Sequence, residues 1–104
     1  MAILNSESLI QIKIRFFSSL RSTTGLDQIE IPINEGETIL NVLHQVENKY
    51  FIPKNAQLLD GDRKKLAVGT LCLINDVDIS LSGGLNQKIN SSINITLISS
   101  IHGG

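Results

Sequence analysis

The chain has few of the residues from which catalytic, metal-binding and disulfide-bonded sites are built. Its 104 residues include one cysteine (Cys72), two histidines and no tryptophan. A single cysteine cannot form an internal disulfide, and one cysteine with two distant histidines does not make a metal-ligand cluster. We therefore expect no bound metal or cofactor. A reducing, cytoplasmic location fits this cysteine usage best.

Strong charge and long apolar runs are also lacking. The formal net charge of −1 argues against direct binding to nucleic acid or to a membrane surface. No apolar stretch is long enough to span a bilayer, and the start, MAILNSESLI, lacks the basic region and apolar core of a signal peptide. What remains is a globular composition, 41% hydrophobic and 18% charged, at a length that suits one domain.

Strict alternation of apolar and polar residues predicts two strands near the start. Leu9–Phe17 alternates throughout, and residues 27–33 alternate again around Pro32. Because proline cannot donate to a strand ladder, the second strand should lie at a sheet edge with Pro32 on its open side. Residues 18–26 are expected to be a turn-rich link short enough to make the two strands an antiparallel hairpin.

The next segment changes from strand to helical periodicity. Apolar residues recur at helical spacing and predict one amphipathic helix from Ile39 to about Tyr50, with Glu47 on the solvent side. Thr38 suits the N-cap, because its hydroxyl can accept from a free amide of the first turn. Pro53 is expected to stop the helix.

The second half of the chain is predicted to complete a sheet. Residues 53–70 are the least regular part and are expected to form a solvated excursion, after which strands are predicted at 71–76, 77–79 and 92–99. Long alternating strands at both ends and one helix to cover them make a two-layer α+β arrangement.

Two apolar side chains have the wrong parity for the core. On the first strand Phe17, and on the last strand Ile98, fall opposite to the apolar set of their own strand. Both should emerge on the sheet face away from the helix, near the root of the C-terminal tail, where an apolar patch would suit docking of a partner. The alternative is that the 53–70 excursion covers them.

Other polar candidates are interpreted as structural or solvated. His44 is expected to be a partly exposed surface residue, and Cys72 a buried, inert thiol. Asp76 and Asp78 share a strand face but are interpreted as solvated acids of a turn. The basic run 63–65 is interpreted as a solvated loop.

The last six residues, SSIHGG, are the most informative part of the sequence. Glycine has no Cβ, so the main chain at Gly103 and Gly104 can pass through a narrow cleft, and a terminal segment can be captured by a partner's active site. The carboxylate of Gly104 is then a reactive handle, and Ile101, His102 and Gly103 are the residues that a partner's channel would contact. The alternative is an arbitrary frayed end.

The order strand, strand, helix, strand, strand, strand, followed by Gly-Gly, resembles the ubiquitin-like sulfur-carrier family. That family includes the molybdopterin synthase small subunit, the thiamine sulfur carrier, the ubiquitin-related modifier and the archaeal small modifier proteins. The matching stretches are IKIRFFSSLRSTTGL, EGETILNVL, LINDVDISLSGGL and ITLISSIHGG. The resemblance implies a β-grasp fold, a mixed sheet with parallel central terminal strands packed on one main helix. Residues 1–8 would be a flexible extension, 9–100 the domain and 101–104 a flexible reactive tail.

The resemblance also implies a function. A ubiquitin-activating-type enzyme would use ATP to adenylate Gly104. A sulfur donor would then convert it to a thiocarboxylate, for a tRNA-thiolation enzyme or the molybdopterin synthase large subunit, or lysines of target proteins would attack it. The chain would supply no catalytic residue and would not itself be an enzyme. The alternatives are a dedicated small subunit of molybdopterin synthase and a β-grasp interaction module with an incidental Gly-Gly end.

Overall fold

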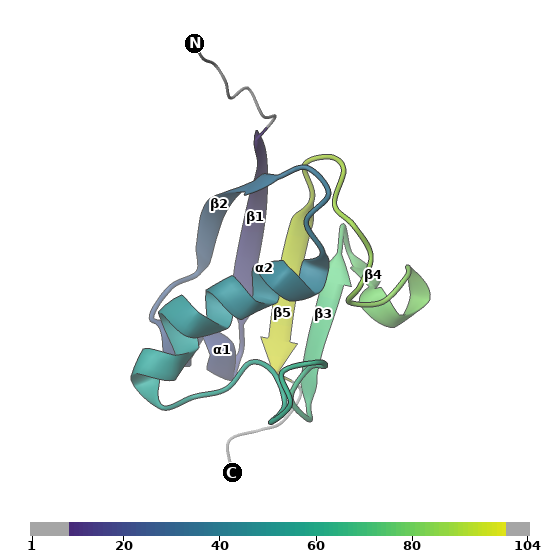
Figure 1. The fold of residues 1–104 in the computed structure, drawn as a ribbon. Coiled ribbons are helices and arrows are strands. Elements are labelled where there is room, and N and C mark those ends of the chain that lie inside the picture. The colour runs from purple at the N-terminus through teal and green to yellow at the C-terminus, as the bar shows by residue number, and fades with distance from the viewer. Residues whose placement is uncertain (1–8, 100–104) are drawn as a thin grey trace.

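The computed structural model describes residues 9–99, and these form a sheet covered on one face by helices (Figure 1). Residues 1–8 and 100–104, which hold the expected extension, the end of the expected domain and the tail, lie outside the described residues. The elements follow in the order β1 (Leu9–Phe17), α1 (Ser19–Thr24), β2 (Gln28–Asn34), α2 (Ile39–Val46), β3 (Thr70–Ile74), β4 (Val77–Asp78) and β5 (Asn94–Ser99).

The five strands make one mixed sheet in the order β2-β1-β5-β3-β4. The two terminal strands, β1 and β5, are neighbours and run parallel, while β2 and β3 pair antiparallel on either side of them. This is the β-grasp topology, so the predicted fold class is confirmed. Pro32 lies on the edge strand β2, as predicted.

The link between β1 and β2 is a helix, so the prediction of a turn-rich link was wrong. Two features hold the short α1 in place. Leu20 and Thr24 are buried beneath it, and Gly25 ends it with φ 75°, donating its N–H to the Arg21 carbonyl at 2.8 Å. A left-handed φ suits glycine, which has no Cβ to clash. Six residues rich in serine and threonine give too little periodicity and helix propensity to predict this helix from the sequence.

The main helix begins where predicted. The Thr38 hydroxyl accepts from the Asn41 N–H at 3.1 Å, which caps α2. The α-helical winding ends at Val46, but a π-helical turn (Glu47–Phe51) and a 3-10 turn (Ile52–Lys54) continue it. The α- and π-helical winding thus ends at Phe51, within one residue of the predicted end near Tyr50. Pro53 does not stop the winding outright, because it sits in the first turn of the 3-10 segment, where no N–H is needed.

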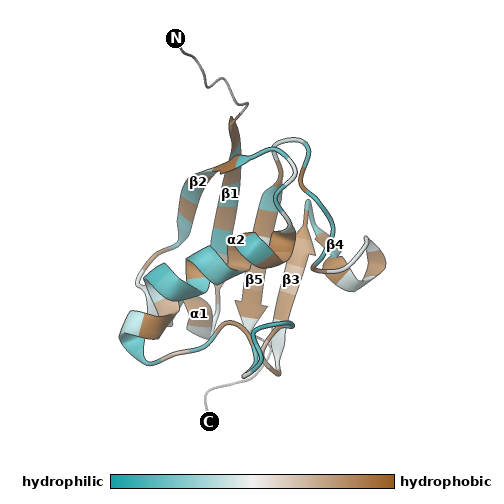
Figure 2. Cartoon of the chain, viewed as in Figure 1, coloured by the Kyte–Doolittle hydropathy of each residue, from teal (hydrophilic) through white to brown (hydrophobic). Residues whose placement is uncertain are grey.

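The core lies between the sheet and α2. The solvent-facing side of α2 is largely hydrophilic, whereas the strands behind it carry alternating apolar residues (Figure 2). At the centre, Phe16 is fully buried and meets the ring of Phe51 edge-on, with 6.1 Å between centroids. The largest fully buried side chains of the core are Phe16, Phe51, Ile12, Ile14, Ile39, Leu43, Leu58, Leu59, Ile95, Leu97, Val42 and Val46.

The predicted strands in the second half are present with shifted ends. β3 ends at Ile74, because Asn75 and Asp76 both adopt positive φ and form the two-residue turn to β4. Mirror-image turns of this kind match the twist of the strands they join. The predicted 77–79 strand stops at Asp78 and passes into a 3-10 turn, and β5 starts at Asn94 rather than 92.

Candidate functional site

An apolar patch lies on the outer face of the sheet, opposite α2, at the end where β5 leaves the sheet. Phe17 of β1 pairs in register with Ile98 of β5, and Ile98 pairs with Leu71 of β3. Neighbouring residues in register project to the same face of a sheet, so the three side chains form one row across three strands. We call Phe17, Ile98 and Leu71 the tail-root patch.

The tail-root patch is accessible to solvent. Phe17 is 36% exposed and Leu71 40% exposed, and Ile98 is half-buried. The 53–70 excursion, which was considered as a cover, instead packs Leu58 and Leu59 into the core. Residues on this row that face solvent contribute little to folding, and such a row is the kind of surface that partners use.

Positive charge borders the tail-root patch. The Arg21 guanidinium lies 5.5 Å from the centroid of the Phe17 ring and pairs with Asp27, with 3.1 Å between Nε and Oδ1. Arg15 is exposed two residues before Phe17 on the same strand face. A partner surface that fits the patch would therefore be apolar at its centre and acidic on that side.

Leu71 was not singled out from the sequence, although a signal for it exists. Once Cys72 faces the core, strand alternation puts Leu71 and Leu73 on the outer face. What the sequence does not reveal is which strands are neighbours, and only the register brings Leu71 beside Ile98.

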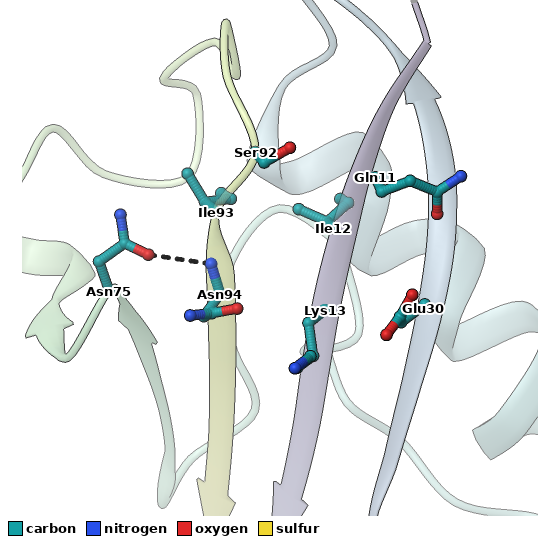
Figure 3. Close-up of a pocket in the computed structure, with 8 residues that line it drawn as sticks. All are labelled: Gln11, Ile12, Lys13, Glu30, Asn75, Ser92, Ile93 and Asn94. Carbon is teal, nitrogen blue, oxygen red and sulfur yellow. Dashed lines mark hydrogen bonds between the residues drawn. The ribbon is translucent and has the colours of Figure 1, made fainter.

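A hollow of about 300 Å³ lies on the same outer sheet face as the tail-root patch, at the opposite end of the strands. Figure 3 shows Lys13 and Glu30 at its lower rim and Asn75 joined to the start of β5. The Asn75 Oδ1 accepts from the Asn94 N–H at 2.9 Å, and the Asn75 N–H donates to the Asn94 carbonyl at 2.8 Å. These amides hold the β3–β4 turn against β5, so this hollow is a polar structural junction rather than a catalytic arrangement.

Glu47 is buried, so the prediction that it faces water was wrong. Its side chain is 3% exposed, and its Oε2 accepts from the N–H groups of Leu58 and Leu59 at 2.9 and 2.8 Å. Its Oε1 accepts from the Arg63 Nε at 2.8 Å. The Glu47 carboxylate thus lies against the 53–70 excursion, where it pairs with two backbone N–H groups and with the charge of Arg63.

The remaining polar candidates take structural positions. His44 is half-buried, and its Nε2 lies 2.7 Å from the Arg63 carbonyl oxygen, a contact that places the proton on Nε2. Arg63 is therefore held by the helix, whereas Lys64 and Lys65 are exposed. The basic run predicted as a solvated loop is solvated at its two lysines only.

Cys72 is buried, as predicted. Burial raises the pKa of its thiol to about 12, with a smaller contribution from the negative charge of Asp78. A thiol that stays protonated is a poor nucleophile and metal ligand.

Two hydrogen bonds from Ser80, one from its hydroxyl at 2.7 Å and one from its N–H at 2.8 Å, lower the pKa of Asp78. Asp78 thus caps a 3-10 turn, and Asp76 is exposed.

Residues 9–99 bring together no three histidine, cysteine or acidic side chains that could hold a metal ion. No helix in that range has the length and apolar character needed to cross a bilayer. The predicted site residues Ile101, His102, Gly103 and Gly104 lie outside the described residues.

The model of one protein family, Urm1 (ubiquitin related modifier), matches residues 11–104. The chain belongs to the ubiquitin related modifier family. The match spans nearly the whole chain, including the tail, so the predicted resemblance to ubiquitin-like sulfur carriers is confirmed. Members of this family are small ubiquitin-like carriers rather than enzymes.

Solved structures of other carriers share the fold. The small archaeal modifier protein 1 from Methanosarcina acetivorans has a TM-score of 0.72 at 26% identity, with 93% of this chain and 99% of that chain covered. Urm1 from Trypanosoma brucei has a TM-score of 0.76 at 19% identity, with 92% of this chain and 97% of that chain covered. A chain in the Amycolatopsis orientalis BexX/CysO complex has a TM-score of 0.66 at 26% identity, with 89% and 99% covered.

Proposed function

We propose that this chain is a ubiquitin-like sulfur carrier and protein modifier that is activated at the carboxylate of Gly104. Membership of the ubiquitin related modifier family supports the class of function. The observation that carries the proposal within the structure is the place where β5 ends. Ser99 pairs with Thr70, one residue beyond the Ile98–Leu71 pair of the tail-root patch.

This position supports separate roles for the two parts: the tail-root patch would bind the partner, and the tail would carry the reacting carboxylate. The five residues that follow Ser99 in the sequence can span at most about 18 Å when fully extended. A partner that docks on the tail-root patch would therefore have its active site within that distance of the end of β5. Docking would then position a carboxylate that has no catalytic side chain of its own.

The proposed chemistry is acyl activation. A ubiquitin-activating-type partner transfers AMP from ATP to the Gly104 carboxylate and releases pyrophosphate, which gives a mixed anhydride with a good leaving group. Sulfur at the oxidation level of hydrosulfide then attacks the carbonyl carbon, so that the C–S bond forms, the bond to AMP breaks and a thiocarboxylate remains. Alternatively a lysine amine of a target protein attacks the same carbon, AMP leaves, and an isopeptide bond forms with loss of a proton. ATP is bound by the partner in both routes.

Two partner assignments remain part of the proposal. The delivered sulfur would go to a tRNA-thiolation enzyme, or to a molybdopterin synthase large subunit if the chain is a dedicated small subunit. The similarity to a chain in the BexX/CysO complex supports a carrier that works in complex with another protein. A stable hetero-oligomer without lysine conjugates would favour the dedicated subunit.

Intact-mass spectrometry of the chain isolated from its native cells tests the proposal. We expect a mass gain equal to one oxygen exchanged for sulfur, localised to the C-terminal peptide and absent when Gly104 is deleted. Adducts joined through Gly104 to lysine would add the modifier role. A tail that stays unmodified, even when ATP and activating enzymes are supplied, would contradict the carrier function. It would favour the alternative of a β-grasp interaction module.

A matched pair of variants tests the docking step separately. Phe17→Ser together with Leu71→Ser should lower kcat/KM for activation of Gly104 roughly tenfold or more, because each removes an apolar contact from the centre of the interface. Val77→Ser with Leu81→Ser removes two apolar side chains that are also exposed but lie outside the patch, and should leave activation unchanged. Equal effects of the two pairs would show that the patch is not the docking surface.

A further inference from the structure

The open edge of the sheet offers a second binding surface, at β2. Among residues 9–99, β2 is the outermost strand on its side of the sheet and pairs with β1 alone (Figure 1). The Phe16 N–H donates to the Asp27 carbonyl at 2.9 Å, which fixes the parity of the β1–β2 ladder. Odd-numbered residues of β2 therefore bond to β1, and even-numbered residues direct their N–H and C=O groups away from the sheet.

These outward backbone groups are available to a further strand. They are the N–H and C=O of Gln28 and Glu30 and the C=O of Pro32, and none of them has a hydrogen-bond partner among residues 9–99. Pro32 has no N–H, so it limits how far a ladder can extend along this edge. The edge accepts a short strand and disfavours long edge-to-edge association.

A groove runs beside this edge, between β2 on one side and the end of α2 with the π-helical turn that follows it on the other. It has a volume of about 280 Å³ and is lined by Ile31, Pro32, Gln45, Val46, Lys49 and Tyr50. On the inner face of β1, Ile12 and Ile14 are fully buried, but Ile29 and Ile31 of β2 are only partly buried. The partly buried side chains of Ile29 and Ile31 thus form an apolar strip along β2, the same strand whose outward backbone groups have no partner among residues 9–99.

The groove also carries an unneutralised positive charge. Lys49 is exposed, and its Nζ lies 5.5 Å from the centroid of the Tyr50 ring. Among residues 9–99 no carboxylate lies within ion-pair distance of it, since the two ion pairs there join Arg21 to Asp27 and Arg63 to Glu47. An acidic side chain over the groove would gain this interaction.

We propose that the β2 edge and its groove bind an extended peptide of a partner protein, which adds to the sheet as a short strand. Alternate side chains of that peptide are apolar and lie in the groove over Ile31 and Tyr50. An acidic residue of the peptide lies beside Lys49. Backbone bonds to Gln28 and Glu30 give the affinity, and the groove gives the sequence preference. The surface is separate from the tail-root patch, so the chain can bind such a peptide whether or not Gly104 is activated.

A library of random octapeptides displayed on phage, selected against the full chain, provides the probe. We expect enriched sequences that alternate apolar residues and carry at least one aspartate or glutamate. A synthetic copy of the most enriched peptide is then titrated into the ¹⁵N-labelled chain. The amide signals of Gln28, Glu30 and Ile31 should shift most, with those of the Gln45–Tyr50 segment. Failure to enrich any sequence, or shifts centred on the outer face, would overturn the proposal.

Backbone methylation of the same peptide tests strand addition directly. In an added strand, alternate N–H groups point to β2 and the others to solvent. N-methylation of two groups of one parity should weaken binding roughly tenfold or more, and methylation of the other parity should leave it nearly unchanged. Equal effects would show that the peptide does not bind as a strand.

Charge variants of the chain complete the test. Lys49→Glu should weaken binding of the acidic peptide roughly fivefold. A copy of the peptide in which lysine replaces the acidic residue should bind the Lys49→Glu variant with the original affinity. Lys65→Glu makes the same charge change at an exposed position outside the groove and should have no effect. If sedimentation instead shows that the chain pairs with itself through β2, the occupant is a second copy and the peptide proposal fails. Gly104 thiocarboxylation would be untouched by either result.

Discussion

Phe16 and Phe17 are neighbours in the sequence but lie on opposite faces of the sheet. Phe16 is fully buried, and its ring packs against Phe51 of the π-helical turn. Phe17 is 36% exposed in the tail-root patch with Arg21 over its ring. The inner face therefore holds the fold together, while the half-exposed apolar residues of the outer face contribute less to stability. That difference separates residues that are needed for folding from residues that are available for docking.

The largest expected effect is on the inner face. Phe16→Ala should lower the free energy of unfolding by about 3–5 kcal/mol, because it leaves a cavity at the centre of the core. Phe17→Ala on the outer face should lower it by about 1 kcal/mol or less, since it removes a half-exposed ring and one cation–π contact. Urea denaturation of both variants measures the difference. Equal losses would mean that the outer face is part of the core.

Glu47 is the next most sensitive position, although it is charged. Glu47→Ala should cost about 2–4 kcal/mol, because the buried N–H groups of Leu58 and Leu59 lose their acceptor. Glu47→Gln keeps an oxygen for those two groups and loses mainly the charge interaction with Arg63, so its cost should be about half as large or less. Denaturant unfolding compares the two. A glutamine variant as unstable as the alanine variant would assign the stability to the ion pair instead.

At neutral pH the smallest expected effect concerns Cys72, because the contribution of its thiol changes only at high pH. Its pKa is raised in the folded chain, so the thiol stabilises the fold fully below the unfolded value of 9.0. As pH rises from about 9 to about 12, the unfolded thiol ionises first and this stability is lost. The loss should approach about 1.4 kcal/mol per pH unit within that window.

Cys72→Ala should remove this alkaline component and leave the rest of the pH dependence in place. Unfolding free energies of both proteins between pH 8 and pH 11 provide the comparison. Parallel curves for the two proteins would contradict a buried, protonated thiol. The same burial predicts that iodoacetamide does not label Cys72 in the folded chain at neutral pH.

Local patterns predicted most of the fold because they report which side of an element is buried. Alternation located the strands, helical spacing located α2, and the hydroxyl of Thr38 marked its start. Pro32 was correctly assigned to an edge because its missing donor is a property of the residue itself. α1 was missed because it is short and is stabilised by burial of Leu20 and Thr24, not by its own propensity.

Glu47 shows why an amphipathic pattern fails for some polar residues. It was predicted to face solvent because it falls outside the set of apolar residues that recur at helical spacing. Its partners are the backbone of Leu58 and Leu59 and the guanidinium of Arg63, 11 to 16 residues further on, in a segment without periodicity. Nothing local to the helix predicts them.

The sequence by itself determined the strands and the main helix of a two-layer arrangement, the parity of Phe17 and Ile98, and the glycine end, because each depends on residue type and spacing alone. Only the tertiary structure decided that Leu71 joins Phe17 and Ile98, because strand order and register bring β3, β5 and β1 together. The open groove beside β2 was likewise decided by packing, since it depends on how far α2 extends over the sheet edge. Such contacts join residues far apart in the chain, and local preferences carry no information about them.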